Sequence, residues 1–564
     1  MKKLLLLVIV GMVALGTISA NGAQEDSAAE EKAVLTVLLD SSDGWVRNFN
    51  PYTSNSKQWN HAFTYEYMAL YDPLNNNRET LWLAEDIISE ADLKTMTVKV
   101  RKGVKWSDGE DFTADDVVFT YSLGKSHPEL DRQGYWGDNG KILSVVALDE
   151  YTVQFNMSKE NRFHRVDMFH EVQIIPEHIW AEVDDPSSFV IETPVCTGPF
   201  SEVVDFTPEM VVLGRNPNYW RGDDLEIDEV RIPQFNGNDG AMALLESGQV
   251  DWAHIFIPEI EKTYIKGDAD RKFWYGKNDG VRMAFNYMTK HEGNNKAFHN
   301  VDFKRAYSMA IDRQGIIDSA VFGYLDSVVP PVTGLPPALW GYKNSKAEEI
   351  KDMYTRYDLD AARALLSEAG FKDTDGDGWV ENPDGSAIEF EILSPAGWSD
   401  WNDGAAISAE GLRAIGINAT AKSPDLGVII ESWETGDHDV LYSGYGKSGN
   451  PWKFYFDTIG DTSRALTQTW WSVTQTNYVS DELSALIDQM PSASDAELKA
   501  ISDKVELHFA ENMINIPMFY NGLWYVYNTS RFTGWSTADN PVCEPALADH
   551  DMKLLHMMQL SPVK

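Results

Sequence analysis

The chain of 564 residues is poor in cysteine and contains only Cys196 and Cys543. Two cysteines this far apart make no structural zinc site, because such a site needs closely spaced thiolate and imidazole ligands. An oxidising compartment would allow one disulfide, but the spacing does not establish it, and we expect two unpaired thiols. The H-E-x-x-H and G-x-S-x-G motifs are also absent, so the sequence marks no hydrolase centre.

Positive charge is scarce as well. The 47 lysines and arginines are outnumbered by 87 aspartates and glutamates, and the net charge is −40. A chain of this charge is repelled by phosphate backbones and by anionic lipid surfaces. We therefore expect no nucleic-acid partner, no binding to anionic membranes and no polyanionic ligand.

Only one long apolar run occurs, from Leu4 to Leu15, after the basic start Met1-Lys2-Lys3. The run is short for a transmembrane helix, and small residues follow it, which is typical of a secretory signal peptide over residues 1–23. The signal peptide contains two lysines and no acid, so the rest of the chain carries −40 − 2 = −42. Residues 24–33 are polar and acidic and predict a disordered tether. We expect a cleaved signal peptide and a periplasmic or secreted protein.

Tryptophan is abundant, with 19 residues. About 540 residues remain after the signal peptide, more than one hydrophobic core accommodates, which predicts two or three domains. Strand-like and helix-like segments alternate after residue 33 without an internal repeat. This alternation predicts mixed α/β domains.

Residues 98–120 are the most informative segment. Val98-Lys99-Val100-Arg101 alternates apolar and charged residues, as a half-buried strand does. Ser107-Asp108-Gly109 predicts a tight turn, and Thr113 to Asp116 has the spacing of a capping box before an apolar run. The segment therefore predicts a strand, a turn and a helix.

The segment RKGVKWSDGEDFTADDVVFTYS closely resembles the corresponding segment of the family 5 solute-binding proteins of bacterial ABC importers. These proteins carry oligopeptides, nickel or oligosaccharides. Other landmarks of that family occur in the same order, and the resemblance covers roughly residues 34–530. These landmarks are Phe49-Asn50-Pro51, Tyr65-Glu66, Leu83-Ala84-Glu85, Thr197-Gly198-Pro199-Phe200, residues 216–220, 245–251 and 303–312, and the strand-like residues 516–520.

The resemblance implies an α/β, two-lobed periplasmic-binding-protein-like fold of type II, with an extra domain in the N-terminal lobe and the ligand between the lobes. Domain I would comprise residues 34–58, 171–287 and 513–564, domain II (the extra domain) residues 59–170, and domain III (the second lobe) residues 288–512. It also implies a monomer that is not an enzyme, requires no cofactor and works with an ABC permease and ATPase. Many relatives are anchored through a cysteine just after the signal peptide. None occurs there in this chain, so we expect a protein without a lipid anchor.

Peptide carriers that resemble this chain hold the peptide's amino terminus with an aspartate in the second lobe. The best alignment places Tyr445 there, and residues 441–455 contain no acid. An aromatic ring suits the C–H face of a pyranose. Residues 250–258 resemble the branch that binds oligosaccharides such as cello-oligosaccharides. We therefore predict a β-linked oligosaccharide as ligand.

The candidate ligand-binding residues are aromatic side chains for stacking and amides for hydroxyl groups. They are Trp59, Trp252, Tyr445 and Trp452 for stacking, and Asn60, Asn286 and Asn450 for hydroxyls. Core packing is the alternative for each of them. The second lobe would also contain Trp398, Trp401, Trp470 and Trp471.

Residues 373–384 have the spacing of a calcium-binding loop. Side-chain ligands would be Asp373, Asp375, Asp377 and Asp384, and Trp379 would offer its backbone carbonyl. Gly378 falls where the loop turns, and Glu381 stands at the ninth position. A helix pattern precedes the loop and a strand pattern follows it, so we predict a helix–loop–strand site with a structural Ca²⁺. An acidic surface loop without metal is the alternative.

Two other functions remain open. An oligopeptide ligand is the first alternative, because backbone contacts can also hold peptides. A secreted glycan-active enzyme or a lectin is the second, although the sequence marks no catalytic carboxylate pair. Nickel binding has no support, because the spacing of His164, His170 and His178 fits no ligand pattern.

Overall fold

The computed structural model describes residues 32–39, 44–53, 58–75, 77–131, 133–137, 140–446, 448–459, 473–545 and 551–564. The predicted signal peptide, most of the predicted tether, Trp470 and Trp471 lie outside these residues. Within the described ranges, no helix is both long and apolar enough to cross a membrane.

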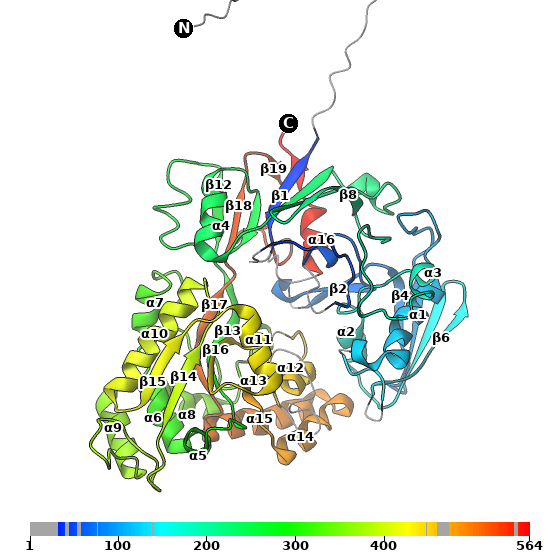
Figure 1. The fold of residues 1–564 in the computed structure, drawn as a ribbon. Helices are drawn as coiled ribbons and strands as arrows, with labels where there is room; N and C mark the ends of the chain where they lie inside the picture. The colour runs from blue at the N-terminus through cyan, green and yellow to red at the C-terminus, as the bar shows by residue number, and fades with distance from the viewer. Residues whose placement is uncertain are drawn as a thin grey trace, which may run out of the picture. The chain divides into compact units, whose positions relative to one another are not determined.

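The first lobe is built on a seven-stranded sheet (Figure 1). The strands β1 and β10 pair in parallel, as do β1 and β11, whereas the other neighbours are antiparallel. The sheet unites the start, the middle and the end of the chain. In sheet order its strands are β12 (Arg271–Trp274), β18 (Tyr525–Asn528), β11 (Trp252–His254), β1 (Val34–Leu38), β10 (Glu229–Pro233), β9 (Met210–Arg215) and β8 (Phe200–Thr207). The helices α4 (Gly237–Glu246) and α16 (Met552–Met557) pack against this sheet, whereas α3 (Glu177–Trp180) contacts α1 (Ala114–Ser126).

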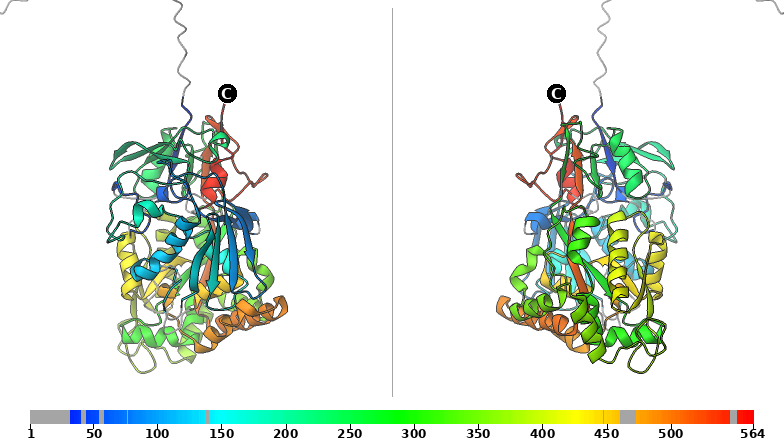
Figure 2. Two further views of the ribbon diagram at one scale, coloured as in Figure 1. Left: turned by 90° about the vertical axis from the view of Figure 1, so that its right-hand side faces the viewer. Right: turned by 90° about the vertical axis from the view of Figure 1, so that its left-hand side faces the viewer.

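A separate four-stranded antiparallel sheet forms the extra domain, and α1 (Ala114–Ser126) packs against it (left panel of Figure 2). Thr113 caps α1, and the carboxylate of Asp116 accepts a hydrogen bond from the Thr113 N–H at 2.9 Å, which is the predicted capping box. Gly109 has φ +101° in the predicted turn. The strand–turn–helix prediction is confirmed. The strands, in order, are β4 (Ala84–Ser89), β5 (Thr95–Val100), β7 (Thr152–Met157) and β6 (Ile142–Asp149), and β2 (Ala69–Asp72) pairs with β3 (Arg78–Leu81) nearby.

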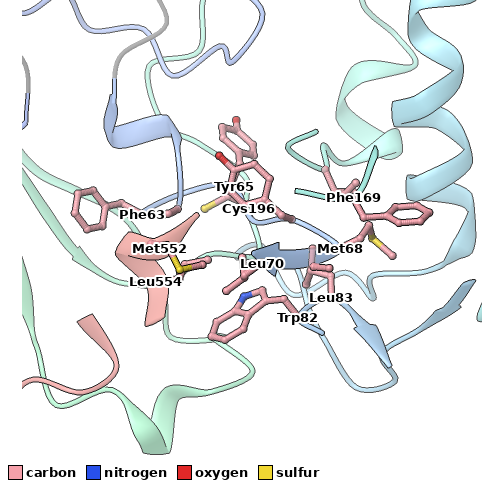
Figure 3. Packing of buried hydrophobic residues seen from close by; sticks show 14 of the residues in the cluster. Phe63, Tyr65, Met68, Leu70, Trp82, Leu83, Phe169, Cys196, Met552 and Leu554 are labelled. Atoms are coloured by element: carbon pink, nitrogen blue, oxygen red, sulfur yellow. The ribbon is translucent and has the colours of Figure 1, made fainter. Parts of the chain in front are cut away.

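The core of the first lobe joins residues that are far apart in the sequence. Figure 3 shows Met552 and Leu554 of α16 among side chains from residues 63–83, with Cys196 close to Tyr65. Cys196 and Cys543 are both buried and free, so the expectation of two unpaired thiols is confirmed. Burial raises the pKa of each thiol, which keeps both protonated.

The second lobe contains a five-stranded sheet. The predicted apolar face of residues 303–312 is confirmed, because Phe303, Ala306, Met309 and Ala310 are all buried. In order the strands are β15 (Asn418–Lys422), β14 (Glu389–Leu393), β16 (Val440–Gly444), β13 (Lys277–Phe285) and β17 (Asn515–Gly522). The main helices are α5 (Glu292–His299), α6 (Val301–Met309), α7 (Arg313–Ser319), α8 (Ser345–Thr355), α9 (Leu359–Glu368), α10 (Ser399–Ala414), α11 (Leu426–Thr435), α12 (Pro451–Thr458), α14 (Asp481–Ile487) and α15 (Asp495–Asn512).

The two faces of this sheet are covered very unequally. Along β16, Tyr442 points into the large cluster that includes α10, whereas Leu441 points into a small cluster with Ile429 and Trp433 of α11. Adjacent residues of a strand face opposite sides, so α10 and α11 cover opposite faces. Within the described residues the small cluster contains four buried side chains, Ala284 being the fourth.

Candidate functional site

The two lobes meet where α4 of the first lobe begins. The backbone N–H of Asn238 donates to the carbonyl of Gly397 at 3.0 Å, and the Asn238 side-chain amide donates to Ser399 Oγ at 2.9 Å. Gly397 has φ +79°, and a Cβ added to it would lie 2.8 Å from the Cα of Gly237. Only glycine allows so close an approach of the two backbones.

A second contact joins the extra domain to the second lobe. The rings of Phe163 and Trp452 stack with centroids 6.3 Å apart and planes 6° apart. Arg162 forms an ion pair with Asp495 at 2.8 Å, and the Asn77 amide donates to the carbonyl of Gly449 at 2.8 Å. The lobes also meet where the Tyr324 hydroxyl donates to Glu261 at 2.6 Å, so several contacts join them in this conformation.

An aromatic hollow lies in the second lobe beside the first of these contacts. It is formed where β14 and β16 end and α10 begins, with α11 as its other wall. The Trp398 and Trp401 rings lie 5.0 Å apart, and Trp401 lies 5.8 Å from Tyr442. The space open to water-sized molecules is about 10 Å³, enough for about one water. Its lining comprises Trp398, Trp401, Trp433, Tyr442 and Ser443 with the apolar residues Leu393, Pro395, Leu426, Ile429 and Leu441.

Asp400 lies between these two tryptophan positions on the first turn of α10 and is buried. Burial raises the pKa of its carboxyl to about 7, although backbone N–H groups and the Asn238 amide lower it. The charge next to the contact between the lobes therefore changes near neutral pH.

Three predicted stacking residues have their rings covered by protein. Trp59 is fully buried beside Trp45, 5.0 Å away, and Trp252 is fully buried 4.6 Å from His556, with its indole N–H donating to the carbonyl of Pro545. Tyr445 is also buried. These rings complete the packing of the lobes, so the structure does not support their assignment to ligand stacking.

Tyr445 is enclosed from several directions. Its hydroxyl donates to the carbonyl of Val332 at 3.0 Å, and the guanidinium of Arg282 lies 4.9 Å from its ring centroid. A Cβ added at Gly334 would lie 2.0 Å from the ring. Any side chain at position 334 would clash with the Tyr445 ring, so this position must be glycine. Protein covers both faces of the ring, which leaves no face on which a sugar could stack.

The predicted amides have mainly structural partners. Asn286 donates to the carbonyls of Gly436 and His438, at 2.9 and 2.8 Å, and Asn60 is fully buried. Asn450 caps α12 by accepting a hydrogen bond from the Lys453 N–H at 2.7 Å. Of the predicted residues, the structure brings Trp452 to the contact between the lobes, and Asn450 directly follows Gly449, which takes part in that contact.

Asp279, an acid near Tyr445, was not predicted from the sequence. Asp279 lies on the neighbouring strand β13, and its Oδ2 is 3.1 Å from where a Cβ at Gly444 would lie. No sequence signal marks Asp279, because only the pairing of β13 with β16 brings it there. No sequence signal marks Trp433 either. It lies on α11 and comes close to Trp398 and Trp401 only because β14 lies between β15 and β16 in the sheet.

The loop over residues 373–384 gathers four acids, but not the predicted four. Ligand oxygens of Asp373, Asp375, Asp377 and Glu381 lie within 4.8 Å of one another. Asp384 lies outside this group and pairs with Lys296 at 2.6 Å, which lowers the pKa of Asp384. The structure thus corrects the predicted ligand set.

Glu381 takes the place that we assigned to Asp384. It is buried, and its carboxylate accepts hydrogen bonds from the N–H and hydroxyl of Thr374, at 2.7 and 2.6 Å. The backbone N–H of Trp379 donates to Asp377 Oδ1 at 2.8 Å. The spacing misidentified Asp384 because its carboxylate accepts hydrogen bonds from Lys296 of α5 and from the N–H and hydroxyl of Ser386, at 2.6, 3.0 and 2.6 Å.

The sequence matches the family model described as bacterial extracellular solute-binding proteins, family 5 middle, over residues 80–466, more than half of the chain. It is 24% identical over 449 residues to the oligopeptide-binding protein AppA of Bacillus subtilis, covering 77% of this chain and 78% of that protein.

Solved structures show the same fold. A periplasmic oligopeptide-binding protein of an ABC transporter from Thermotoga maritima, with mannohexaose bound, superposes with a TM-score of 0.83 at 25% identity, over 94% of this chain and 99% of that one. AppA of Bacillus subtilis in complex with a nonapeptide superposes with a TM-score of 0.75 at 23% identity, over 94% and 100%. The predicted α/β two-lobed binding-protein fold is confirmed.

Proposed function

Since the chain belongs to the family 5 bacterial extracellular solute-binding proteins and is the substrate-binding component of an ABC transporter, we propose that it captures an oligosaccharide between its two lobes. The aromatic hollow carries this proposal. Its three indole rings and one phenol ring suit the C–H faces of sugar rings, and it lies beside the contact of Asn238 with Gly397 and Ser399. The mannohexaose in the relative from Thermotoga maritima agrees with this ligand class.

An oligopeptide is the second candidate, and two observations favour it. Asp279 supplies a carboxylate next to Gly444, one residue before Tyr445. Curated relatives such as AppA are named for oligopeptides. In this alternative Asp279 would pair with the peptide's amino terminus.

A thermal-shift screen distinguishes the two candidates. One panel holds cello-, laminari-, manno- and xylo-oligosaccharides, and the other holds di- to pentapeptides. A ligand at 100 times its Kd stabilises the folded state by about 2.7 kcal/mol, which raises the Tm by a couple of degrees or more. We expect a shift with one sugar series. A shift with peptides alone, abolished in Asp279→Asn, would overturn the oligosaccharide proposal.

The protein would bind its ligand, deliver it to the permease and ATPase, and leave it chemically unchanged. Incubation with the bound oligosaccharide should leave its length unchanged by mass spectrometry. We propose that the exported protein is a monomer without its signal peptide or an acyl chain. The mass of the purified protein tests this, and an acyl chain would contradict it.

We also propose that Asp373, Asp375, Asp377 and Glu381 hold a structural Ca²⁺. Four carboxylates within 4.8 Å repel one another unless a cation compensates them, and calcium prefers such oxygen ligands. Addition of Ca²⁺ to metal-free protein should raise the Tm, and Asp375→Asn should reduce this rise. An unchanged Tm in rigorously metal-free buffer would favour an acidic loop without metal.

A further inference from the structure

The chain crosses between the two lobes through short connections (Figure 1). It passes from the first sheet to the second between β12 and β13, through Tyr275 and Gly276, and it returns between β17 and β18, through Leu523 and Trp524. The strands on either side of each crossing are held in their sheets. A rotation of one lobe against the other must therefore be absorbed by the backbone of these residues, which form the hinge.

Backbone hydrogen bonds of the hinge lie on either side of one rotatable bond. On the side of the second lobe, the Leu523 N–H donates to the carbonyl of Gly276 at 2.7 Å. On the side of the first lobe, the Ile255 N–H donates to the carbonyl of Trp524 at 2.8 Å. A rotation about the N–Cα bond of Trp524, matched by one about the N–Cα bond of Gly276, preserves both hydrogen bonds. The lobes can therefore turn at Trp524 without losing them.

Trp524 is strained in the present conformation. Its φ is +48°, in the left-handed region, where a bulky side chain is unfavourable because its Cβ approaches the following carbonyl oxygen. Two other residues with positive φ have a local reason for it, since Met513 ends α15 and Leu93 lies in the turn between β4 and β5. Trp524 lies between two strands, where no helix ends. Its strain therefore points to a function.

Aromatic packing holds Trp524 in this conformation. The residue is 6% exposed, and its ring centroid lies 4.9 Å from that of Phe256 and 4.8 Å from that of Tyr275. Phe256, which follows β11 of the first lobe, stacks on Phe322, which follows α7 of the second, with centroids 6.3 Å apart. A Cβ added at Gly522 would lie 2.5 Å from the Trp524 ring. A strained backbone persists only where its surroundings fix it, and here part of the surroundings comes from the opposite lobe.

The lobes also touch beside the hinge through a polar side-chain contact. The hydroxyl of Tyr324 donates to Glu261 at 2.6 Å, and this pair is exposed. An exposed hydrogen bond contributes little net free energy, because water replaces either partner. This contact can therefore be lost when the lobes separate, without the cost of an unsatisfied buried group.

We propose that Trp524 is a strained hinge residue, left-handed while the lobes touch and relaxed when they separate. Its backbone strain favours the open form of the ligand-free protein, and the bound ligand supplies the free energy that closes it. Because ligand is held by the closed form, strain that makes this form rarer lowers the apparent affinity in proportion. This inference rests on the proposed capture of a ligand between the lobes and adds the residue that sets the equilibrium between open and closed forms.

Two variants separate the strained backbone from the buried ring. Trp524→Gly and Trp524→Ala both remove the ring, but only alanine keeps the Cβ that makes a φ of +48° unfavourable. Titration calorimetry with mannohexaose and cellohexaose should show an affinity about 5- to 30-fold higher for Trp524→Gly than for Trp524→Ala. Small-angle scattering without ligand should give the smaller radius of gyration for Trp524→Gly, because the closed form is less strained in that variant.

Matched controls lie away from the hinge. Trp535 is also 6% exposed, but it packs on Trp252 within the first lobe. Trp535→Gly and Trp535→Ala should both lower the Tm and should bind the hexaose with equal affinity. Leu93→Gly removes a left-handed side chain, φ +54°, within the extra domain. We expect Leu93→Gly to keep or raise the Tm and to bind with wild-type affinity, since strain within one lobe does not change the closing equilibrium.

Scattering keeps the test decisive whatever the ligand is. Equal affinities and equal radii of gyration for Trp524→Gly and Trp524→Ala would overturn the strained hinge. If neither variant folds, the wild type decides: without ligand its radius of gyration should exceed that of the structure with touching lobes, and an equal radius would overturn the proposal. If the wild type binds no oligosaccharide, the proposed function fails, and the ligand-free radii of the two variants still test the hinge.

Discussion

Tryptophan residues of the two lobes occupy contrasting environments. In the first lobe, Trp59 and Trp252 are fully buried and surrounded by other rings and strands. In the second lobe, Trp398, Trp401 and Trp433 line a hollow at the ends of β14 and β16. The position of an aromatic residue relative to the strand ends, rather than its type, therefore separates core packing from a place in the proposed ligand site. Trp252 lies within the first sheet and is covered on both sides, whereas Trp398 directly precedes α10 and Trp401 and Trp433 stand on α10 and α11, beside the strand ends of the second sheet.

The largest expected effect comes from breaking the first-lobe packing. Trp252→Ala should lower the free energy of unfolding by about 3–5 kcal/mol, because it removes a buried ring between Trp535 and His556. Urea denaturation measures the change. If the folded variant kept its stability and lost sugar binding instead, Trp252 would belong to the ligand site and the contrast between the lobes would fail.

Asp400 should give the second lobe a pH dependence of stability. Its pKa is about 7 in the folded protein, whereas an unfolded aspartate has about 3.9. The folded state therefore holds the proton more tightly, and this stabilisation is complete below about pH 4 and is lost as the pH rises to 7, by up to about 1.4 kcal/mol per pH unit. Urea denaturation between pH 4 and 7 should show a shallower decline for Asp400→Asn.

The exposed acid Asp360 on α9 is the control for this effect, because its side chain is 96% accessible. Asp360→Asn should keep the wild-type slope. Equal slopes for the wild type and Asp400→Asn would show that Asp400 is ionised in the folded protein over the whole range.

The contact between the lobes allows a sharper test. Gly397→Ala and Gly385→Ala both place alanine at a positive φ, +79° and +83°, and each should cost about 1–2 kcal/mol of stability. Only the Cβ at position 397 meets the other lobe, at Gly237, while nothing lies within 4 Å of the one at 385. We expect weaker ligand binding, and less compaction on ligand addition in small-angle scattering, for Gly397→Ala alone. Equal binding by both variants would show that this contact is not needed for capture.

The smallest expected effect concerns the hollow. Trp398→Ala should weaken oligosaccharide binding by about 0.5–1.5 kcal/mol, the contribution of one stacking contact. Trp398 is only partly buried, so its loss should change stability far less than that of Trp252. Trp136→Ala in the extra domain is the control and should bind with unchanged affinity. Unchanged binding by Trp398→Ala would remove this ring from the site.

Local features were largely predictable from the sequence. The capping box at Thr113 and Asp116, the turn at Gly109 and the apolar face of α6 depend on residues a few positions apart, whose geometry is the same in any protein. The order of the family landmarks predicted the two-lobed fold in the same way.

The individual site residues were not predictable to the same extent. Tyr445 was expected to face the ligand because of its place in an alignment, yet Val332, Gly334 and Arg282 enclose it. In the acidic loop, the spacing identified three of the four clustered acids but replaced Glu381 by Asp384. Each error arose where a distant segment decided the position of a side chain.

The local elements, the α/β class, the negative charge and the set of aromatic residues could be predicted from the sequence, because they depend on composition and on neighbours along the chain. Which aromatics pack in the core and which line the hollow depends on long-range packing. Residues 398, 401, 433 and 442 meet because β14 lies between β15 and β16 in the sheet, although β15 and β16 follow each other along the chain. The contact of Gly237 with Gly397 likewise depends on how the lobes come together. Long-range packing sets these distances, and no pattern along a single segment encodes them.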